Sequence, residues 1–333
     1  MLILLSFLLS VLGTERYRHY ALAKQILDVP NARSAHHLPT PRGGGVVFVL
    51  ISLVAMLYLH MLPQTLLLIG LGVAILGYLD DQYDLSAWIR LACQAGLCAL
   101  ALYSLPEIPV IHIGSWLLPL QGWTLGLALL YLMWMLNLYN FMDGINGIAG
   151  FEAMSVVLGM GCLYFAVGIA HGMEACLIVA AAVAGFLIWN FPKAKIFMGD
   201  VGSSFLGFLF GIWSLYMASR HPDLWWSWLI LLGVFIVDAT LTLLLRMLKR
   251  EALHQAHANH AYQISARHFN SHSIVTLSIL CINMMWLWPC AFAVGLGYIQ
   301  GLTGMLIAYL PIAALVGFFK CHSHSSPIQA FYD

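Results

Sequence analysis

The chain has 333 residues, of which 62% are hydrophobic and only 8% are charged, and its formal net charge is zero. Soluble domains carry about 25% charged residues, so the composition excludes an ordinary soluble protein. The zero net charge gives no general attraction to nucleic acid. The apolar stretches continue without alternation for about 15–20 residues, which is typical of membrane helices and not of membrane β-strands. The composition predicts an all-α, polytopic membrane protein.

The first apolar stretch, residues 2–20, has no basic residues before it and no small-residue cleavage site. It therefore does not resemble a cleaved signal peptide. Arg16 and Arg18 follow the apolar residues, and this order predicts a retained anchor whose N-terminus lies outside the cell.

Eleven apolar segments are predicted as transmembrane helices, which together make a single integral-membrane domain over residues 1–333. They cover approximately residues 2–20, 44–61, 65–80, 86–105, 122–138, 148–167, 173–190, 201–218, 225–246, 273–295 and 300–319. Residues 106–121 hold prolines and a glycine among short β-prone pieces, which predicts an extramembrane hairpin or loop. The seven cysteines show no CxxC pairing and are interpreted as packing residues.

The basic residues indicate which gaps between these segments face the cytoplasm. With eleven spans, all of the 14 Lys and Arg residues except Arg220 lie on one side. The positive-inside rule makes that side cytoplasmic, and the C-terminus lies there too. The same side carries polar loops, where we expect the active site. These loops are approximately residues 21–43, 80–86, 138–147, 190–200 and 247–272.

Carboxylates collect at the cytoplasmic helix ends, where they are costly unless something binds them. Asp80 and Asp81 are adjacent, so their charges repel unless a cation lies near them. The alternative for this pair is a solvated helix end, which also describes Asp84. Asp238 lies inside a predicted span and is either functional or paired with a neighbouring helix.

A second polar cluster ends the fifth predicted helix. Asn137, Asn140 and Asp143 recur at every third position, so in a helix they follow one slanting stripe. Amide and carboxylate oxygens are hard ligands that suit Mg²⁺. Two glycines flank Asn146, whose amide suits the edge of a nucleobase. The alternative is a polar loop with turn glycines.

Asp200 stands at the expected N-terminus of a helix, directly after residues 197–199. Helix N-termini favour anions, so an acid at this point indicates a metal that carries the anion. No Walker phosphate loop occurs in the chain. Gly43–Gly45 follow Arg42 and either approach a phosphate or permit close helix packing, and both interpretations stay open.

His254, His257 and His260 recur at every third position among basic residues. They lack cysteine partners and the HxxxH spacing, so phosphate binding is a better interpretation than zinc binding. The alternative is a basic loop that lies on anionic lipid.

These segments, in this order, resemble the polyprenyl-phosphate N-acetylhexosamine-1-phosphate transferases, a superfamily of glycosyltransferase family 4 type. The superfamily includes enzymes that initiate O-antigen synthesis and the muramyl-pentapeptide transferase of peptidoglycan synthesis. The matching segments extend over nearly the whole chain, and several separate motifs in one order make the resemblance specific. They are Asp28–His36, Pro41–Gly45, Asp80–Asp81, Asn137–Gly147, Asn190–Asp200 and His257–His260.

The resemblance implies that a UDP-activated amino sugar donates its sugar 1-phosphate to undecaprenyl phosphate and releases UMP. It implies Mg²⁺ as the cofactor, with Mn²⁺ as the alternative. Asn140 and Asp200 match the metal-binding positions. Asp80 and Asp81 match the acidic pair that engages or deprotonates the acceptor phosphate, and Asp143 is expected to be a third catalytic acid. The remaining implied positions are Asn146, Asn190 and Phe197 for the nucleotide, and His36, Arg42, His257 and His260 for phosphate or sugar.

Local details favour a small UDP-amino sugar over the muramyl-pentapeptide donor, which stays the alternative. The histidine segment lacks the tighter cluster of the peptidoglycan enzyme, and Asp28–Arg33 looks closer to the O-antigen and lipopolysaccharide initiators. Asn146 stands where many relatives have Asp, so the base contact differs there. The resemblance therefore implies an initiating enzyme of O-antigen or cell-envelope polysaccharide synthesis in the bacterial inner membrane.

A secondary transporter is the alternative from another class of protein. Transporters place ionisable groups near the membrane midplane, whereas here most of them lie at one face and Asp238 lies inside a span. The expected partners are the UDP-amino sugar, undecaprenyl phosphate and the lipid bilayer, without nucleic acid. Relatives include homodimers, but no motif requires one. The sequence leaves open which sugar is used and whether the reaction passes through a covalent intermediate.

Overall fold

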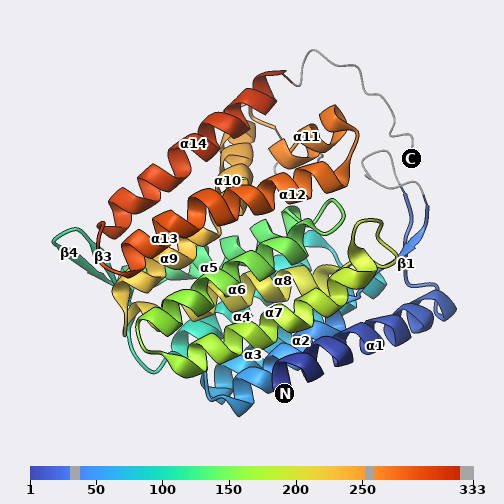
Figure 1. Ribbon diagram of the computed structural model, residues 1–333, viewed down its shortest axis with the longest axis horizontal. Coiled ribbons are helices and arrows are strands. Elements are labelled where there is room, and N and C mark those ends of the chain that lie inside the picture. Colours follow the sequence, from blue (N-terminus) through green and yellow to red (C-terminus); the bar gives the residue numbers. More distant parts are fainter. Residues whose placement is uncertain (31–37, 252–258, 323–333) are drawn as a thin grey trace.

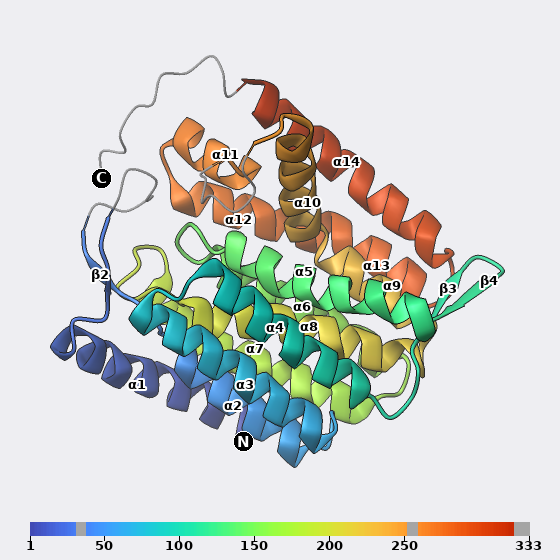
Figure 2. The same ribbon diagram turned by 180° about the vertical axis from the view of Figure 1, so that it is seen from behind.

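The computed structural model describes residues 1–30, 38–251 and 259–322. Most of its helices lie side by side along one direction, with α1 at one edge and α14 at the opposite edge (Figures 1 and 2). The α-helices are α1 (Leu2–Ala23), α2 (Gly45–Tyr58), α3 (Gln64–Tyr83), α4 (Ala87–Tyr103), α5 (Leu125–Phe141), α6 (Ile148–Ala166), α7 (Ala170–Asn190), α8 (Asp200–Ala218), α9 (Pro222–Leu231), α10 (Gly233–Leu248), α11 (Ala261–Phe269), α12 (His272–Ile282), α13 (Trp288–Gly295) and α14 (Gly301–His322).

Two short antiparallel hairpins lie at opposite ends of the helical bundle (Figure 1). Strands β1 (Leu27–Asp28) and β2 (Thr40–Pro41) pair at one end. At the other end β3 (Val110–Ile113) pairs with β4 (Trp116–Pro119), which confirms the hairpin predicted for residues 106–121. A 3₁₀ turn at Gly122–Thr124 leads from this hairpin into α5.

Helices that could cross a membrane dominate the described residues, so the polytopic all-α class is confirmed. Seven helices are long and apolar enough, and the pair α9 and α10 would make an eighth. The helices α2 and α4 are apolar but shorter, and α1 carries Glu15, Arg16 and Arg18 in its second half. Each of the eleven predicted segments contains a helix, but the count of eleven spans is not confirmed.

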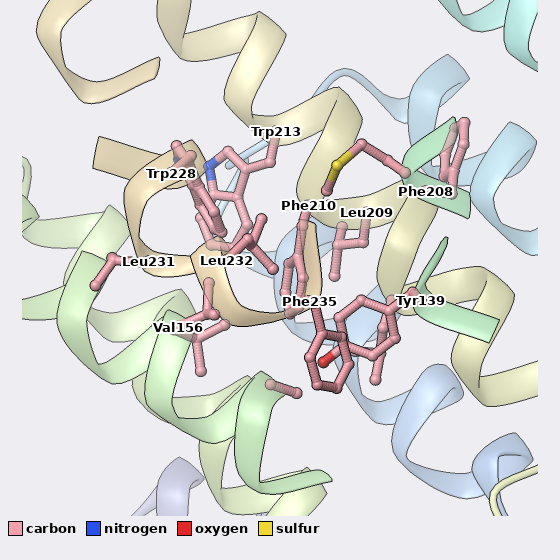
Figure 3. Packing of buried hydrophobic residues seen from close by; sticks show 14 of the residues in the cluster. Tyr139, Val156, Phe208, Leu209, Phe210, Trp213, Trp228, Leu231, Leu232 and Phe235 are labelled. Atoms are coloured by element: carbon pink, nitrogen blue, oxygen red, sulfur yellow. The ribbon is translucent and has the colours of Figure 1, made fainter. Parts of the chain in front are cut away.

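The helix α8 forms the centre of the bundle because neighbours cover nearly all of its surface. It packs against α3, α5, α2 and α9. Figure 3 shows the aromatic part of this core, in which the rings of Trp213 and Trp228 lie 5.2 Å apart. Tyr139 of α5 lies 5.7 Å from Phe210 and 5.0 Å from Phe235. This burial fixes the first turn of α8, where Asp200 lies.

Two predicted spans are irregular in ways that the hydrophobic pattern did not predict. The segment predicted at residues 225–246 is broken into α9 and α10, which meet at an angle of 70°. The segment predicted at residues 273–295 contains a π-helical stretch, Asn283–Leu287, between α12 and α13. There Asn283 donates a hydrogen bond to Glu152 of α6 at 2.5 Å. Gly233 lies at the break between α9 and α10, and Pro289, which has no backbone N–H to donate, follows the π-helical stretch.

Candidate active site

The centre of the site is the meeting point of the C-terminal end of α3 and the first turn of α8. Asp81 of α3 accepts hydrogen bonds from the backbone N–H groups of Asp200 and Val201, at 3.0 and 3.1 Å. These N–H groups have no partner within their own helix, and the positive end of the helix dipole favours a carboxylate there. Asp81 is only 3% exposed. Asp81 therefore fixes the position of Asp200.

Glycines allow the three helices around Asp200 to approach closely. A Cβ atom on Gly77 of α3 would overlap the backbone carbonyl of Asp200. A Cβ atom on Gly45 of α2 would lie 2.5 Å from the Cα atom of Gly202 in α8. Side chains at these positions would push the helix ends apart and open the site.

Arg90 of α4 links the other carboxylates and was not predicted as a site residue. One of its guanidinium N–H groups lies 2.6 Å from Asp80 and 3.5 Å from Asp200. Asp80 also accepts a hydrogen bond from the backbone N–H of Leu85 at 2.8 Å. The place of Arg90 in the first turn of the helix after the acidic pair was the available sequence signal.

Asn137 and Asn140, which were predicted to lie along one stripe of α5, contact different residues. Asn140 lies within hydrogen-bonding range of the Asp200 carboxyl group. Asn137 instead donates to Gln94 of α4 at 3.0 Å and to the backbone carbonyl of Met133 at 2.8 Å. The structure thus brings together the two predicted metal ligands, Asn140 and Asp200, from different helices.

Asp143 lies just beyond the end of α5, in the loop before α6. Its backbone N–H donates to the carbonyl of Asn140 at 3.1 Å. Burial and the nearby charge of Asp81 raise the pKa of the Asp143 carboxyl well above its usual range. This loop carboxyl therefore holds a proton more readily than an ordinary aspartate.

We expect Asp143→Asn to raise the thermal stability of the protein without substrate. The folded state binds the Asp143 proton more tightly than the unfolded chain, so the free energy of unfolding falls as pH rises above about 4. The Asn variant lacks this decline. Melting temperatures of both proteins in metal-free buffer, compared from about pH 5 to pH 8, should therefore diverge as pH rises. A constant difference would contradict the raised pKa.

The donor set suits a hard divalent cation. Among the residues that the structure describes, no three His, Cys, Asp or Glu side chains are grouped closely enough to hold a metal alone. Mg²⁺ does not need such a group, because it usually takes one or two carboxylates and completes its shell with waters and substrate phosphates. Asp200 and Asn140 supply such oxygens, and a small cavity reaches Asp80, Arg90 and Asp200. The residues present fit Mg²⁺.

The predicted nucleotide-binding residues meet beside the loop that follows α5. Asn190 accepts a hydrogen bond from the Gly147 N–H at 2.8 Å and donates to the carbonyl of Ile196 at 2.9 Å. The side chain of Asn146 donates to the carbonyl of Pro192 at 3.1 Å. Asn190 thus braces the two loops against each other. That either residue also contacts a nucleotide stays a prediction.

Phe197 lies half-buried in the loop before α8. The contacts of this loop with Gly44 and Gly45 distinguish phosphate binding from close helix packing. The N–H groups of Gly44 and Gly45 donate to the carbonyls of Phe197 and Met198, both at 2.9 Å. These two amides are therefore used inside the protein, and Gly45 packs against α8. The structure shows the close-packing interpretation for Gly44 and Gly45.

The sequence assigned no role to Asp84 or Asp238. In the structure each of them contacts a predicted site residue. Asp84 accepts a hydrogen bond from Arg42 at 2.8 Å. Burial lowers the pKa of Arg42, but neighbouring carboxylates raise it more, so the pKa is raised overall. The hydrogen bond to Asp84 makes the largest of these raising contributions. Asp238 of α10 lies 3.6 Å from the imidazole of the buried His260. His36 and His257 lie outside the described residues.

The helix α11 connects Asp238 with the C-terminal end of α5, directly before the loop that contains Asp143. Asp238 accepts hydrogen bonds from the backbone N–H groups of Ala261 and Tyr262, at 2.9 and 3.0 Å. The Tyr262 hydroxyl donates to the carbonyl of Phe141 at 2.9 Å. Asp238 therefore acts as a cap that positions α11 against the site.

Comparison with known proteins indicates the family of the central part of the chain. Residues 63–218 match the model of glycosyl transferase family 4. The chain contains a glycosyl transferase family 4 domain. This domain includes Asp80, Asp81, Asn140, Asp143 and Asp200, and the resemblance to the polyprenyl-phosphate N-acetylhexosamine-1-phosphate transferase superfamily is confirmed.

The similarity of this chain to curated relatives extends beyond the matched domain. The chain is 26% identical over 302 residues to a probable undecaprenyl-phosphate N-acetylglucosaminyl 1-phosphate transferase of Bacillus subtilis, covering 85% of this chain and 83% of the relative. It is 27% identical to a phospho-N-acetylmuramoyl-pentapeptide-transferase of Streptococcus thermophilus, over 73% and 77% of the two chains. A decaprenyl-phosphate N-acetylglucosaminephosphotransferase of Mycobacterium tuberculosis is 28% identical, over 61% and 56%.

Proposed function

We propose that this protein transfers an N-acetylhexosamine 1-phosphate from a UDP-sugar to undecaprenyl phosphate and releases UMP. The observation that carries the proposal is the convergence of Asp80 and Asp81 of α3, Asn140 of α5 and Asp200 of α8 beside Arg90. The names of the Bacillus subtilis and Mycobacterium tuberculosis relatives support a polyprenyl phosphate acceptor, and all three names support an N-acetylated amino sugar.

The proposed reaction needs charge neutralisation and positioning more than covalent chemistry. An oxygen of the acceptor phosphate bonds to the phosphorus that carries the sugar. The bond from that phosphorus to the bridging oxygen breaks, and its electron pair leaves on UMP. Asp200 and Asn140 would hold the Mg²⁺, which supplies positive charge to the diphosphate of the donor.

The different surroundings of Asp80, Asp81 and Asp143 suit them to different roles in the proposed reaction. The carboxylate of Asp81 is occupied by the first turn of α8, and that of Asp80 by Arg90 and Leu85. No hydrogen bond to the Asp143 side chain lies within the described residues, and burial and Asp81 raise its pKa. Asp143 is therefore the best placed of these acids to take a proton from the acceptor phosphate.

The proposed site lies where both substrates can reach it. The acceptor is a lipid, whereas the donor is a charged, water-soluble nucleotide, so the reaction requires a membrane–water boundary. The helix ends that carry the acids also hold the basic residues. This supports a multi-pass protein of the bacterial inner membrane, with the site on the cytoplasmic face and the C-terminus on the same side.

One experiment tests both the reaction and its side. Inverted membrane vesicles that contain the protein, given UDP-GlcNAc and Mg²⁺ with undecaprenyl phosphate in the bilayer, should release UMP. Sealed right-side-out vesicles should release it only after permeabilisation, because UDP-GlcNAc does not cross the bilayer. Activity in intact right-side-out vesicles, with none in intact inverted vesicles, would reverse the proposed orientation. No UMP with any UDP-amino sugar would contradict the proposed function.

The choice of donor is tested with the same preparation. UDP-GlcNAc, UDP-GalNAc, a 6-deoxy amino sugar and UDP-MurNAc-pentapeptide are compared at equal concentration. We propose a small amino sugar, and with it the initiating step of O-antigen or another cell-envelope polysaccharide. Exclusive use of the pentapeptide donor would replace this by the peptidoglycan reaction.

A further inference from the structure

One buried carboxyl group, on α6, has no part in the proposed reaction. Glu152 is only 1% exposed, and so is Asn283 of the π-helical stretch, whose side-chain NH₂ group donates to Glu152 Oε2 at 2.5 Å. The second oxygen of each side chain, Glu152 Oε1 and Asn283 Oδ1, is buried and has no hydrogen-bond partner among the described residues. Buried polar atoms without a partner are rare, so this pair calls for an explanation.

The hydroxyl groups beside this pair already donate to other atoms. Tyr139 and Tyr309 lie near enough to Glu152 to interact with its charge. The Tyr139 hydroxyl donates to the carbonyl of Ala149 at 2.9 Å. The Tyr309 hydroxyl donates to the carbonyl of Leu229 at 2.6 Å. An ionised Glu152 would therefore keep a single hydrogen bond inside an apolar bundle, which is so costly that a buried acid takes up a proton instead.

A proton on Glu152 satisfies both unpaired oxygens at once. A carboxylic acid has one O–H donor, and a side-chain amide has one carbonyl acceptor. With the proton on Oε1, the acid can donate to Asn283 Oδ1 while Oε2 still accepts the N–H of the amide. The acid and the amide are then joined by two hydrogen bonds in a closed ring, and neither needs a further partner.

The helix that follows Ser271 connects this pair with the active-site loop. Both α12 and the π-helical stretch pack along α6. At the start of α12, Thr276 donates to the backbone carbonyl of Asn146 at 2.9 Å, and the Asn146 N–H donates to His272 at 3.4 Å. Asn283 lies about two helical turns further along the chain. Polar contacts therefore join this segment to α6 and to the loop before α6 at two levels.

The contact between Glu152 and Asn283 fixes how far α12 is shifted along α6. Apolar contacts specify such a shift weakly, whereas a buried polar pair is satisfied in one register only, as a single buried Asn is in coiled coils. A shift of α12 would leave Asn283 unpaired. It would also carry Thr276 away from the carbonyl of Asn146, the residue predicted to contact the nucleotide.

We propose that Glu152 is a protonated positioning residue, which donates its O–H to Asn283 and so fixes α12 where it holds Asn146 for the donor nucleotide. This inference rests on the proposed function. Glu152 touches neither substrate in this scheme and acts only through α12.

Two substitutions of Glu152 test this role. Glu152→Gln keeps the ring, because its NH₂ group replaces the O–H as the donor to Asn283, so the KM for UDP-GlcNAc should stay within about twofold of wild type. Glu152→Leu removes both hydrogen bonds, and the KM for UDP-GlcNAc should rise by about 10- to 100-fold. The KM for undecaprenyl phosphate should stay within about twofold in both variants. A merely structural role would lower the melting temperature without this difference between the two substrates.

Infrared spectroscopy reports the proton itself. The wild-type protein without substrate should show the C=O band of a neutral carboxylic acid that disappears in Glu152→Gln. Glu174→Gln is the matched control, because Glu174 lies half-buried on the neighbouring α7 near the end away from Asn190. This control should keep the band. If Glu152→Gln removes only carboxylate bands, Glu152 is ionised and the inference is overturned.

Thr276→Val provides a second kinetic test should Glu152→Leu fail to fold. It removes only the hydroxyl that contacts Asn146 and should also raise the KM for UDP-GlcNAc. An unchanged KM in Thr276→Val would show that α12 does not position the donor. A Glu152→Gln variant with the Glu152→Leu phenotype would show that the charge is needed, and it too would overturn the inference. Failure of the proposed function appears instead as absent UMP release in wild type, on which the infrared result does not depend.

Discussion

Asp200→Asn is expected to abolish turnover at any practical Mg²⁺ concentration while leaving the protein folded. Asp200 lies beside Asn140, Asp80 and Arg90, and its carboxylate is the best placed to hold the cation in the proposed site. A charge-stabilising ligand contributes several kcal/mol to such a transition state, so the loss should be about 10³-fold or more. UMP release is measured over a range of Mg²⁺ concentrations.

The stability of this variant separates a functional role from a structural one. Asp200 is surrounded by like charges from Asp80 and Asp81, so neutralising it relieves repulsion and should hold or raise the melting temperature in metal-free buffer. Asp223→Asn is the matched control, because Asp223 is also an acid in the first turn of its helix. Wild-type rates for Asp200→Asn would remove Asp200 from the proposed metal site.

Asp81→Asn is expected to lose both activity and stability, in contrast to Asp200→Asn. Both oxygens of Asp81 accept backbone N–H groups of α8. The substituted amide side chain would keep one oxygen to accept a hydrogen bond. Its NH₂ group would face the second backbone N–H of α8, so both donors would lack an acceptor. The unpaired, buried donors should cost about 1–3 kcal/mol, which exceeds the relief of repulsion from neighbouring acids. The melting temperature and UMP release report the two effects.

The activity loss in Asp81→Asn must be separated from the stability loss. Both assays are therefore run well below the melting transition of the variant, where UDP binding by calorimetry shows that the nucleotide site is intact. We expect UDP to bind within a few-fold of wild type while turnover is crippled. Normal turnover together with a lowered melting temperature would leave Asp81 as a helix cap alone.

Local sequence patterns predicted much of the helical organisation. Unbroken apolar runs placed a helix in each of the eleven predicted segments, and the prolines of residues 106–121 predicted the hairpin. Apolarity does not report where a helix bends, so the 70° break between α9 and α10 and the π-helical stretch at Asn283–Leu287 were missed. Gly233 at the break and Pro289 after the π-helical stretch are local features that apolarity alone does not use.

The sequence singled out the polar residues that the structure brings together, but it did not single out Arg90. Asp80, Asp81, Asn140 and Asp200 stand out because polar residues at membrane helix ends are costly. Arg90, by contrast, is an ordinary interfacial cation in the sequence. Only the packing of α4 against α3 brings it to Asp80 and Asp200.

The sequence by itself determined that this is a helical membrane protein with acids gathered at one set of helix ends. The length of an apolar segment and the charges at its ends can be read from that segment alone, without knowledge of its neighbours in the fold. The tertiary structure decided the pairing of those groups: Asp81 with the first turn of α8, Asp84 with Arg42, and Asp238 with α11. Such pairing depends on how far each helix is shifted along its neighbour, which close contacts at Gly45, Gly77 and Gly202 set.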